Sequence, residues 1–169
     1  MRTLITIIFI CNFLAVFSQN NLQYQNIKKL IFPSKIDTFE TKGVKVFYTN
    51  IPDLNFTCMI TTISKDSIIN QKRFYRSLQI IIEGYFSSEN WKYHQREQVD
   101  TIIGKVEGIL VHGYEPSKPA AVKEFFDFFT IVDGKNYVIT GGSIKDLTPA
   151  FKKEVDSFLQ SLEFEGKNY

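Results

Sequence analysis

The chain of 169 residues can form one domain with a sizeable core, because 44% of its residues are hydrophobic and 15% are aromatic. Its formal net charge is +2 at pH 7, and loss of Arg2 with an N-terminal signal would leave 19 basic against 18 acidic residues. A balance this close to neutral indicates neither a nucleic-acid partner nor an anionic membrane surface.

The first 18 residues have the pattern of a cleavable signal peptide. Arg2 supplies one positive charge, the run Leu4–Phe17 is mostly apolar, and Ser18 is a small residue before a cut at Gln19. A membrane-spanning helix needs about 20 apolar residues, and this run is shorter. We therefore expect residues 1–18 to be removed, leaving no membrane anchor and a periplasmic or secreted protein.

A leader and two strands are expected next. Residues 19–39 begin with a polar stretch that predicts an unordered leader, and residues 40–169 are expected to form a single domain. Side chains alternate cleanly over Gly43–Thr49, and Phe56–Ile63 is rich in threonine and β-branched residues, so both segments are predicted strands. The Pro52-Asp53 pair between them predicts a hairpin.

A helix should follow, because apolar residues recur with a helical period from Phe74 to Tyr85. Its expected limits are Ser67 and Ser87. An exposed strand is then predicted over Trp91–Val99, and a turn at Ile103-Gly104 leads to another strand over Val106–Tyr114.

The clearest hairpin joins Glu124–Val132 to Tyr137–Thr140 through Asp133-Gly134. Phenylalanines on both faces of its first strand predict a central strand that is covered on both sides. Gly141-Gly142-Ser143 is expected to connect this hairpin to a second helix.

That last helix should begin at Pro149, with Thr148 as its N-cap. Its apolar stripe, which includes Phe151, Val155 and Phe158, is expected to cover the aromatic strand. The order of elements therefore predicts an α+β fold, an antiparallel sheet of about six strands with two main helices packed on it.

This order resembles the PsbP-like fold family, named for an extrinsic subunit of photosystem II and including small exported bacterial proteins. The resemblance covers roughly residues 40–164 and rests on three segments. They are the strand pair and helix of Gly43–Phe86, the turn within Asp100–Gly108, and the ending that runs from Asp133–Thr140 through an amphipathic helix to Ser161–Phe164. It implies a binding or assembly accessory without catalytic residues, cofactor or metal.

Few residues offer chemistry of their own. His94 and His112 are the only histidines, and neither has a further ligand at metal-binding spacing, so His112 is expected to be an ordinary sheet histidine. Cys58 lies in an apolar strand, and Cys11 leaves with the signal, so an internal disulfide is excluded. Cys58 is expected to be an inert core residue, with a reactive thiol as the alternative.

A glycine-rich segment and a group of carboxylates are two further candidates for a site. Gly141-Gly142-Ser143 before a helix could hold an anion, but it lacks the spacing of a phosphate-binding loop, which favours a plain connector. Glu97, Asp100 and Glu107 surround one turn, where a solvated sheet edge is the ordinary interpretation of such carboxylates.

The sequence thus predicts an exported, non-enzymatic accessory protein that binds an unidentified protein partner. The alternative is a carrier that holds an apolar small molecule in a pocket between helix and sheet, since the aromatic residues could line such a pocket. A hydrolase is disfavoured, because no nucleophile, base and orienting group can be assembled from the sequence.

Overall fold

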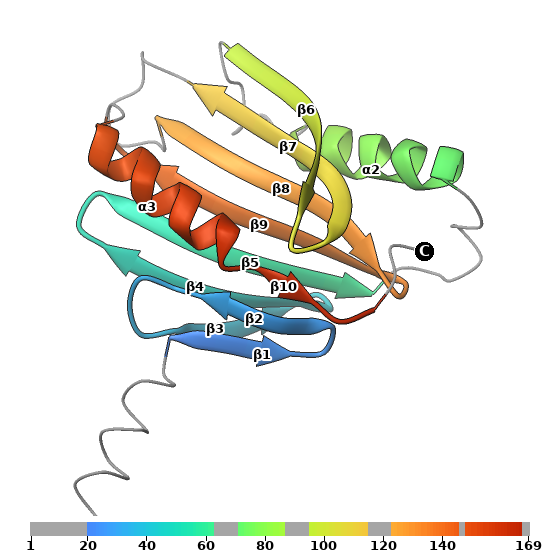
Figure 1. The fold of residues 1–169 in the computed structure, drawn as a ribbon, viewed down its shortest axis with the longest axis horizontal. Coiled ribbons are helices and arrows are strands. Elements are labelled where there is room, and N and C mark those ends of the chain that lie inside the picture. Colours follow the sequence, from blue (N-terminus) through green and yellow to red (C-terminus); the bar gives the residue numbers. More distant parts are fainter. Residues whose placement is uncertain (1–19, 63–70, 87–94, 115–122, 146–147, 167–169) are drawn as a thin grey trace, which may run out of the picture.

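The computed structural model describes residues 20–62, 71–86, 95–114, 123–145 and 148–166 (Figure 1). Within them, the chain forms two antiparallel sheets, a large sheet of seven strands and a small sheet of three, with two helices. The prediction of about six strands with two main helices packed on them is wrong. The described part of the chain is mostly strand, and a second sheet is present that the sequence pattern did not reveal.

The elements follow one another along the chain with short connections. The large sheet has the order β3-β4-β5-β9-β8-β7-β6. It contains β3 (Asp37–Thr41), β4 (Val44–Ile51), β5 (Leu54–Thr62), β6 (Gln95–Ile103), β7 (Val106–Tyr114), β8 (Glu124–Val132) and β9 (Lys135–Ser143). The small sheet contains β1 (Asn21–Tyr24), β2 (Ile27–Ile31) and β10 (Glu163–Phe164), and the helices are α2 (Gln71–Phe86) and α3 (Pro149–Gln160).

Tight turns with positive backbone φ join the strands of the hairpins β4–β5, β6–β7 and β8–β9. Asp53 between β4 and β5 has a φ of 68°, and Lys105 between β6 and β7 has a φ of 69°. Asp133 and Gly134, between β8 and β9, have φ values of 47° and 74°. Short polar residues and glycine tolerate this conformation best, so the hairpins predicted at Pro52-Asp53 and Asp133-Gly134 are confirmed.

The polar stretch predicted to be an unordered leader, Gln19–Asn26, contains the strand β1. The next segment, Ile27–Phe32, for which the sequence predicts a short strand or a turn of helix, forms the strand β2. Residues 19–39 thus supply β1, β2 and the start of β3. β2 pairs with β1 on one side and, on the other, with β10 near the end of the chain, where Lys29 lies opposite Glu163. The sequence pattern missed this small sheet because all three of its strands are short and because β10 lies far along the chain from β1 and β2.

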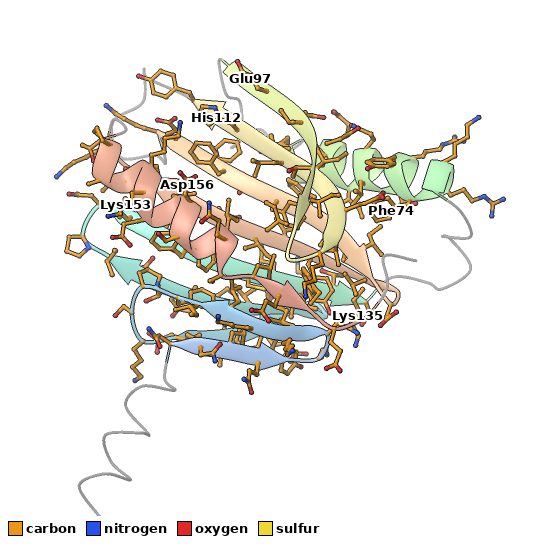
Figure 2. All side chains as sticks on the ribbon, in the orientation of Figure 1. Phe74, Glu97, His112, Lys135, Lys153 and Asp156 are labelled. Atoms are coloured by element: carbon orange, nitrogen blue, oxygen red, sulfur yellow. The ribbon has the colours of Figure 1, made fainter. Side chains whose placement is uncertain are left out.

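Each face of the large sheet has its own cover (Figure 1). On the face that carries α2, which we call the α2 face, Phe74, Leu78 and Ile82 are fully buried against β7 and β8. Figure 2 shows Phe74 at this interface. The opposite face, the α3 face, is covered by α3 and the small sheet. The aromatic strand β8 lies in the interior of the sheet and is covered on both sides, as predicted.

The last helix begins as predicted, because the backbone N–H of Phe151 donates to the Thr148 hydroxyl at 3.2 Å. It packs mainly on β9 and β2 rather than on β8. Phe158 lies at the centre of this interface, with its ring centroid 5.0 Å from those of both Phe32 and Phe56. One side chain of α3 therefore contacts β5 of the large sheet and the residue that follows β2 of the small sheet.

Candidate functional site

A histidine and a glutamate meet on the α3 face, where β7 and β8 run side by side. Nε2 of His112 lies 2.6 Å from Oε1 of Glu124, whose side chain is only 5% exposed. The imidazole also stacks on the ring of Phe126, with the centroids 4.3 Å apart and the planes inclined by 4°. A buried carboxylate and an aromatic ring thus fix the orientation of an imidazole that is 34% exposed.

A carboxylate–imidazole pair is one part of several catalytic and metal sites. Nucleophilic catalysis would also need a hydroxyl or thiol within hydrogen-bonding reach of the imidazole. Cys58 does not meet this need, because it lies on β5, three strands from β7, a separation of about 14 Å at ordinary strand spacing. Among the described residues, no three potential metal ligands come together.

Sequence reasoning placed His112 in the sheet but missed its partner. Glu124 lies at the start of β8 opposite Tyr114, two positions along β7 from His112. Side chains alternate between the two faces along each strand. Once the register of β7 and β8 is known, this alternation places His112, Tyr114 and Glu124 on one face. His94, the other histidine, lies outside the described residues.

The three acidic residues that the sequence brought to one turn separate onto two faces. Glu97 lies opposite His112 on the α3 face, and Figure 2 shows the two at the same end of the sheet. Asp100 and Glu107 belong to the α2 face, where the Tyr75 hydroxyl lies 3.3 Å from Oε2 of Glu107. Glu97 and Asp100 are exposed, which is the solvated edge position expected of them.

Cys58 and the glycine-rich segment serve the core. Cys58 is fully buried, and this burial raises the pKa of its thiol far above the usual value, so the predicted core position is confirmed. Gly141-Gly142-Ser143 is not a connector, because it continues β9. A Cβ atom on Gly141 would come within 2.9 Å of Val155, so glycine is needed here to let α3 approach the sheet.

The hydroxyl of Ser143 is already engaged in local structure. It donates to the Asp53 carbonyl oxygen at 3.2 Å and accepts from the Lys145 backbone N–H at 3.1 Å. The Ser143 hydroxyl thus joins the turn at Asp53 to the end of β9.

Asp127 is a buried polar residue that the sequence analysis passed over. It lies on the α2 face of β8, opposite Thr140, and is fully buried between Phe125 and Phe129. Both of its carboxyl oxygens lack a hydrogen-bond partner. Burial raises the pKa of Asp127 from 3.8 to about 7, and the nearby Thr140 hydroxyl offsets a smaller part of that rise. The available signal was a single acid inside an otherwise apolar and aromatic run.

The ring of Phe86, at the end of α2, packs on the two phenylalanines that flank Asp127 on the same face. Its centroid lies 5.5 Å from that of Phe125 and 6.2 Å from that of Phe129. Asp127 is therefore buried in a strand segment whose neighbouring side chains on this face belong to an aromatic cluster.

Exposed apolar side chains gather on β6, the last strand of the large sheet. Val99 on the α3 face is 58% exposed, and Ile102 on the α2 face is 69% exposed. The strand at the other edge, β3, is shorter, with five residues against nine, and it exposes Phe39. Both edges of the sheet thus present apolar groups, and β6 offers the longer run.

Two shallow grooves flank α3. One, of about 200 Å³, lies beside its first turn and includes Asp53, Lys145 and Glu154. The other, of about 250 Å³, lies between α3 and the end of β2 and includes Ile31 and Phe158. Both are smaller than the roughly 300–1,000 Å³ of ordinary small-molecule sites, and neither is lined by a residue of α2.

Comparison of the chain with protein-family models and with curated proteins found no match. The PsbP-like resemblance consequently stays a prediction from the order of its sequence segments. Among the residues that the structure describes, no helix has the length and apolar character needed to cross a membrane.

Proposed function

We propose that this protein is an exported, non-enzymatic accessory that acts by contact with another protein. The observation that carries the proposal is the contrast between a packed core and exposed apolar side chains away from it. Phe74, Leu78 and Ile82 are fully buried beneath α2, whereas Ile80 on α2 is 65% exposed and Phe39 on β3 is 49% exposed. The apolar groups open to a partner are therefore at the surface.

The filled interface under α2 is where the alternative function would need a cavity. A carrier of an apolar small molecule requires an enclosed volume between helix and sheet. The side chains of α2 occupy that space by packing on Phe125, Phe129 and Ile131 of β8. The grooves beside α3 contain charged groups such as Lys145 and Glu154, which suit an apolar ligand poorly.

The His112–Glu124 pair does not favour an enzyme over an accessory. Its carboxylate is buried and satisfied by the imidazole, and Phe126 covers one face of that ring. These contacts hold His112 in place, because the carboxyl group fixes one ring nitrogen and Phe126 fixes the plane of the ring. The pair is accounted for as part of the structure.

Site-specific photocrosslinking in the native host would test the accessory function. A photoreactive residue is introduced at Ile80 on α2 (65% exposed), at Phe39 on β3 (49% exposed) or at Ile144 after β9 (42% exposed). The matched control is Lys153, which lies on the exposed face of α3 (Figure 2). We expect an adduct with one other protein from at least one apolar position and none from the control.

The captured protein is then purified and titrated against the accessory by calorimetry, with wild-type protein and with lysine at the crosslinking position. Saturable binding that the lysine variant loses supports the proposal. Absence of any adduct, together with a copurified apolar molecule in native mass spectrometry, would establish the carrier instead.

A further inference from the structure

The edge strand β6 has an outer side that nothing covers within the described residues. It is the terminal strand of the large sheet, and its backbone pairs only with β7. The register with β7 runs without a bulge from Gln95 opposite Tyr114 to Ile103 opposite Val106. The strand is therefore regular over its whole length and ready to accept another strand.

Natural proteins usually protect such an edge with lysine, proline, a bulge or a very short strand. β3 follows this rule, since it is only five residues long. β6 has nine residues, contains neither lysine nor proline, and carries the exposed Val99 and Ile102 on its two faces. Its charged residues, Arg96, Glu97 and Asp100, have both signs, so they oppose pairing only in those registers that bring like charges together. A long, regular edge with exposed apolar groups can pair with another chain in the remaining registers.

We propose that the occupant is a second copy of this chain, and that the two β6 strands pair antiparallel about a two-fold axis at Val99. The two seven-stranded sheets would then become one continuous sheet. The two α2 helices would lie on one face of it and the two α3 helices on the other, because an axis perpendicular to the sheet preserves its faces.

Symmetry and charge select the register. Across such an axis each residue meets one from the same face, so a single residue must lie opposite itself at the centre. Glu97 or Asp100 at the centre would place two carboxylates directly opposite each other, which is destabilising. Gln98 or Thr101 at the centre would leave part of β6 unpaired.

Val99 at the centre pairs all of β6 and leaves no like charges opposite each other. The two Val99 side chains cover one another, Gln98 meets Asp100 of the second copy, and Glu97 meets Thr101. An amide and a hydroxyl can each donate a hydrogen bond to the carboxylate that they meet. With Gln98 at the centre, Arg96 would lie opposite Asp100. Ile102 and Ile103, however, would then have no partner in β6. Val99 is therefore the centre that pairs the whole strand without like charges opposite each other.

Disulfide trapping in the purified protein tests both the pairing and its register. Directly opposed residues of antiparallel strands have Cβ atoms about 4.5–5.5 Å apart, close to the separation in a disulfide. Val99→Cys should therefore form an intermolecular disulfide under mild oxidation. The natural Cys58 does not interfere, because it is fully buried.

Two variants serve as controls. Ile80→Cys is on the outer surface of α2 and is exposed to a similar extent as Val99, so it reports random collisions. Gln98→Cys would meet Asp100 rather than itself. We expect Val99→Cys to cross-link at least tenfold faster than either control. Sedimentation of the wild-type protein should show a concentration-dependent dimer that Val99→Lys weakens by tenfold or more.

Equal cross-linking rates for the three cysteine variants, or a wild-type protein that sediments as a monomer at every concentration, would overturn the proposal. Faster cross-linking of Gln98→Cys would overturn the register. The experiments use this chain alone, so self-pairing goes beyond the accessory function and can succeed or fail independently of it.

Discussion

Replacing Asp127 with asparagine should remove most of the pH dependence of stability between about pH 4 and pH 7, and should stabilise the protein above that range. The wild-type carboxyl group is fully buried, and among the described residues neither of its oxygens has a hydrogen-bond partner. The charged form loses the hydration that water gives it in the unfolded chain. This loss disfavours ionisation and raises the pKa of Asp127 to about 7.

The sign follows from proton uptake. The unfolded chain loses the Asp127 proton near pH 3.8, whereas the folded chain keeps it until about pH 7, so unfolding releases a proton between these values. Stability due to the neutral carboxyl group is full below about pH 4 and is lost as the pH rises to about 7. A pKa difference of this size corresponds to about 4 kcal/mol, a large share of an ordinary stability of about 5–15 kcal/mol.

Urea unfolding at several pH values from about 4.5 to about 8.5, at constant ionic strength, measures this effect. Asp127→Asn cannot ionise, so its unfolding free energy should exceed that of the wild type by up to about 4 kcal/mol at the alkaline end. At the acid end it should be equal or up to about 3 kcal/mol lower, because the amide must also be satisfied in the core. Asp156→Asn, at an exposed carboxylate on α3, is the control and should follow the wild type. Parallel curves for the wild type and Asp127→Asn would refute the reasoning.

Three further outcomes are expected. Phe158→Ala should lower the unfolding free energy by about 3–5 kcal/mol, because Phe158 is 2% exposed and its ring packs on those of Phe32 and Phe56. When the three variants are compared by thermal denaturation, Lys152→Ala and Lys153→Ala should change stability little. Cys58 should react with a thiol reagent only after denaturant is added, since burial leaves the thiol inaccessible and raises its pKa, and immediate labelling would contradict this. Intact mass of the exported protein should correspond to a chain that begins at or near Gln19, and recovery of the full-length chain from membranes would contradict cleavage.

Local signals in the sequence were sufficient where structure is set by neighbouring residues. The turn at Asp133-Gly134 was predicted because the hairpin needs positive φ there, and both residues have it. The N-cap at Thr148 was predicted because its hydroxyl can accept a backbone N–H, and Phe151 donates to it. Helical periodicity from Phe74 identified α2 for the same reason, since the periodic residues Phe74, Leu78 and Ile82 all meet one surface.

The parts of the fold that local signals did not predict depend on pairing between distant parts of the chain. β2 looks like a short apolar segment by itself, and its strand character is fixed by β10, which has only two residues. The glycines before Ser143 look like a connector, yet they extend β9 because β5 pairs with it along that stretch. The candidate site was harder still, since the contact between His112 and Glu124 follows from the register of two strands rather than from any spacing.

The pairing of β2 with β10 has a consequence for the order in which the small sheet can form. β2 can pair with β1 as soon as both strands have been made, but its other neighbour, β10, consists of Glu163 and Phe164. Phe32 likewise meets the ring of Phe158 only in the last helix. Contacts this far apart in sequence form slowly. The small sheet would therefore be completed late, after the hairpins of the large sheet that are local in sequence have had time to form.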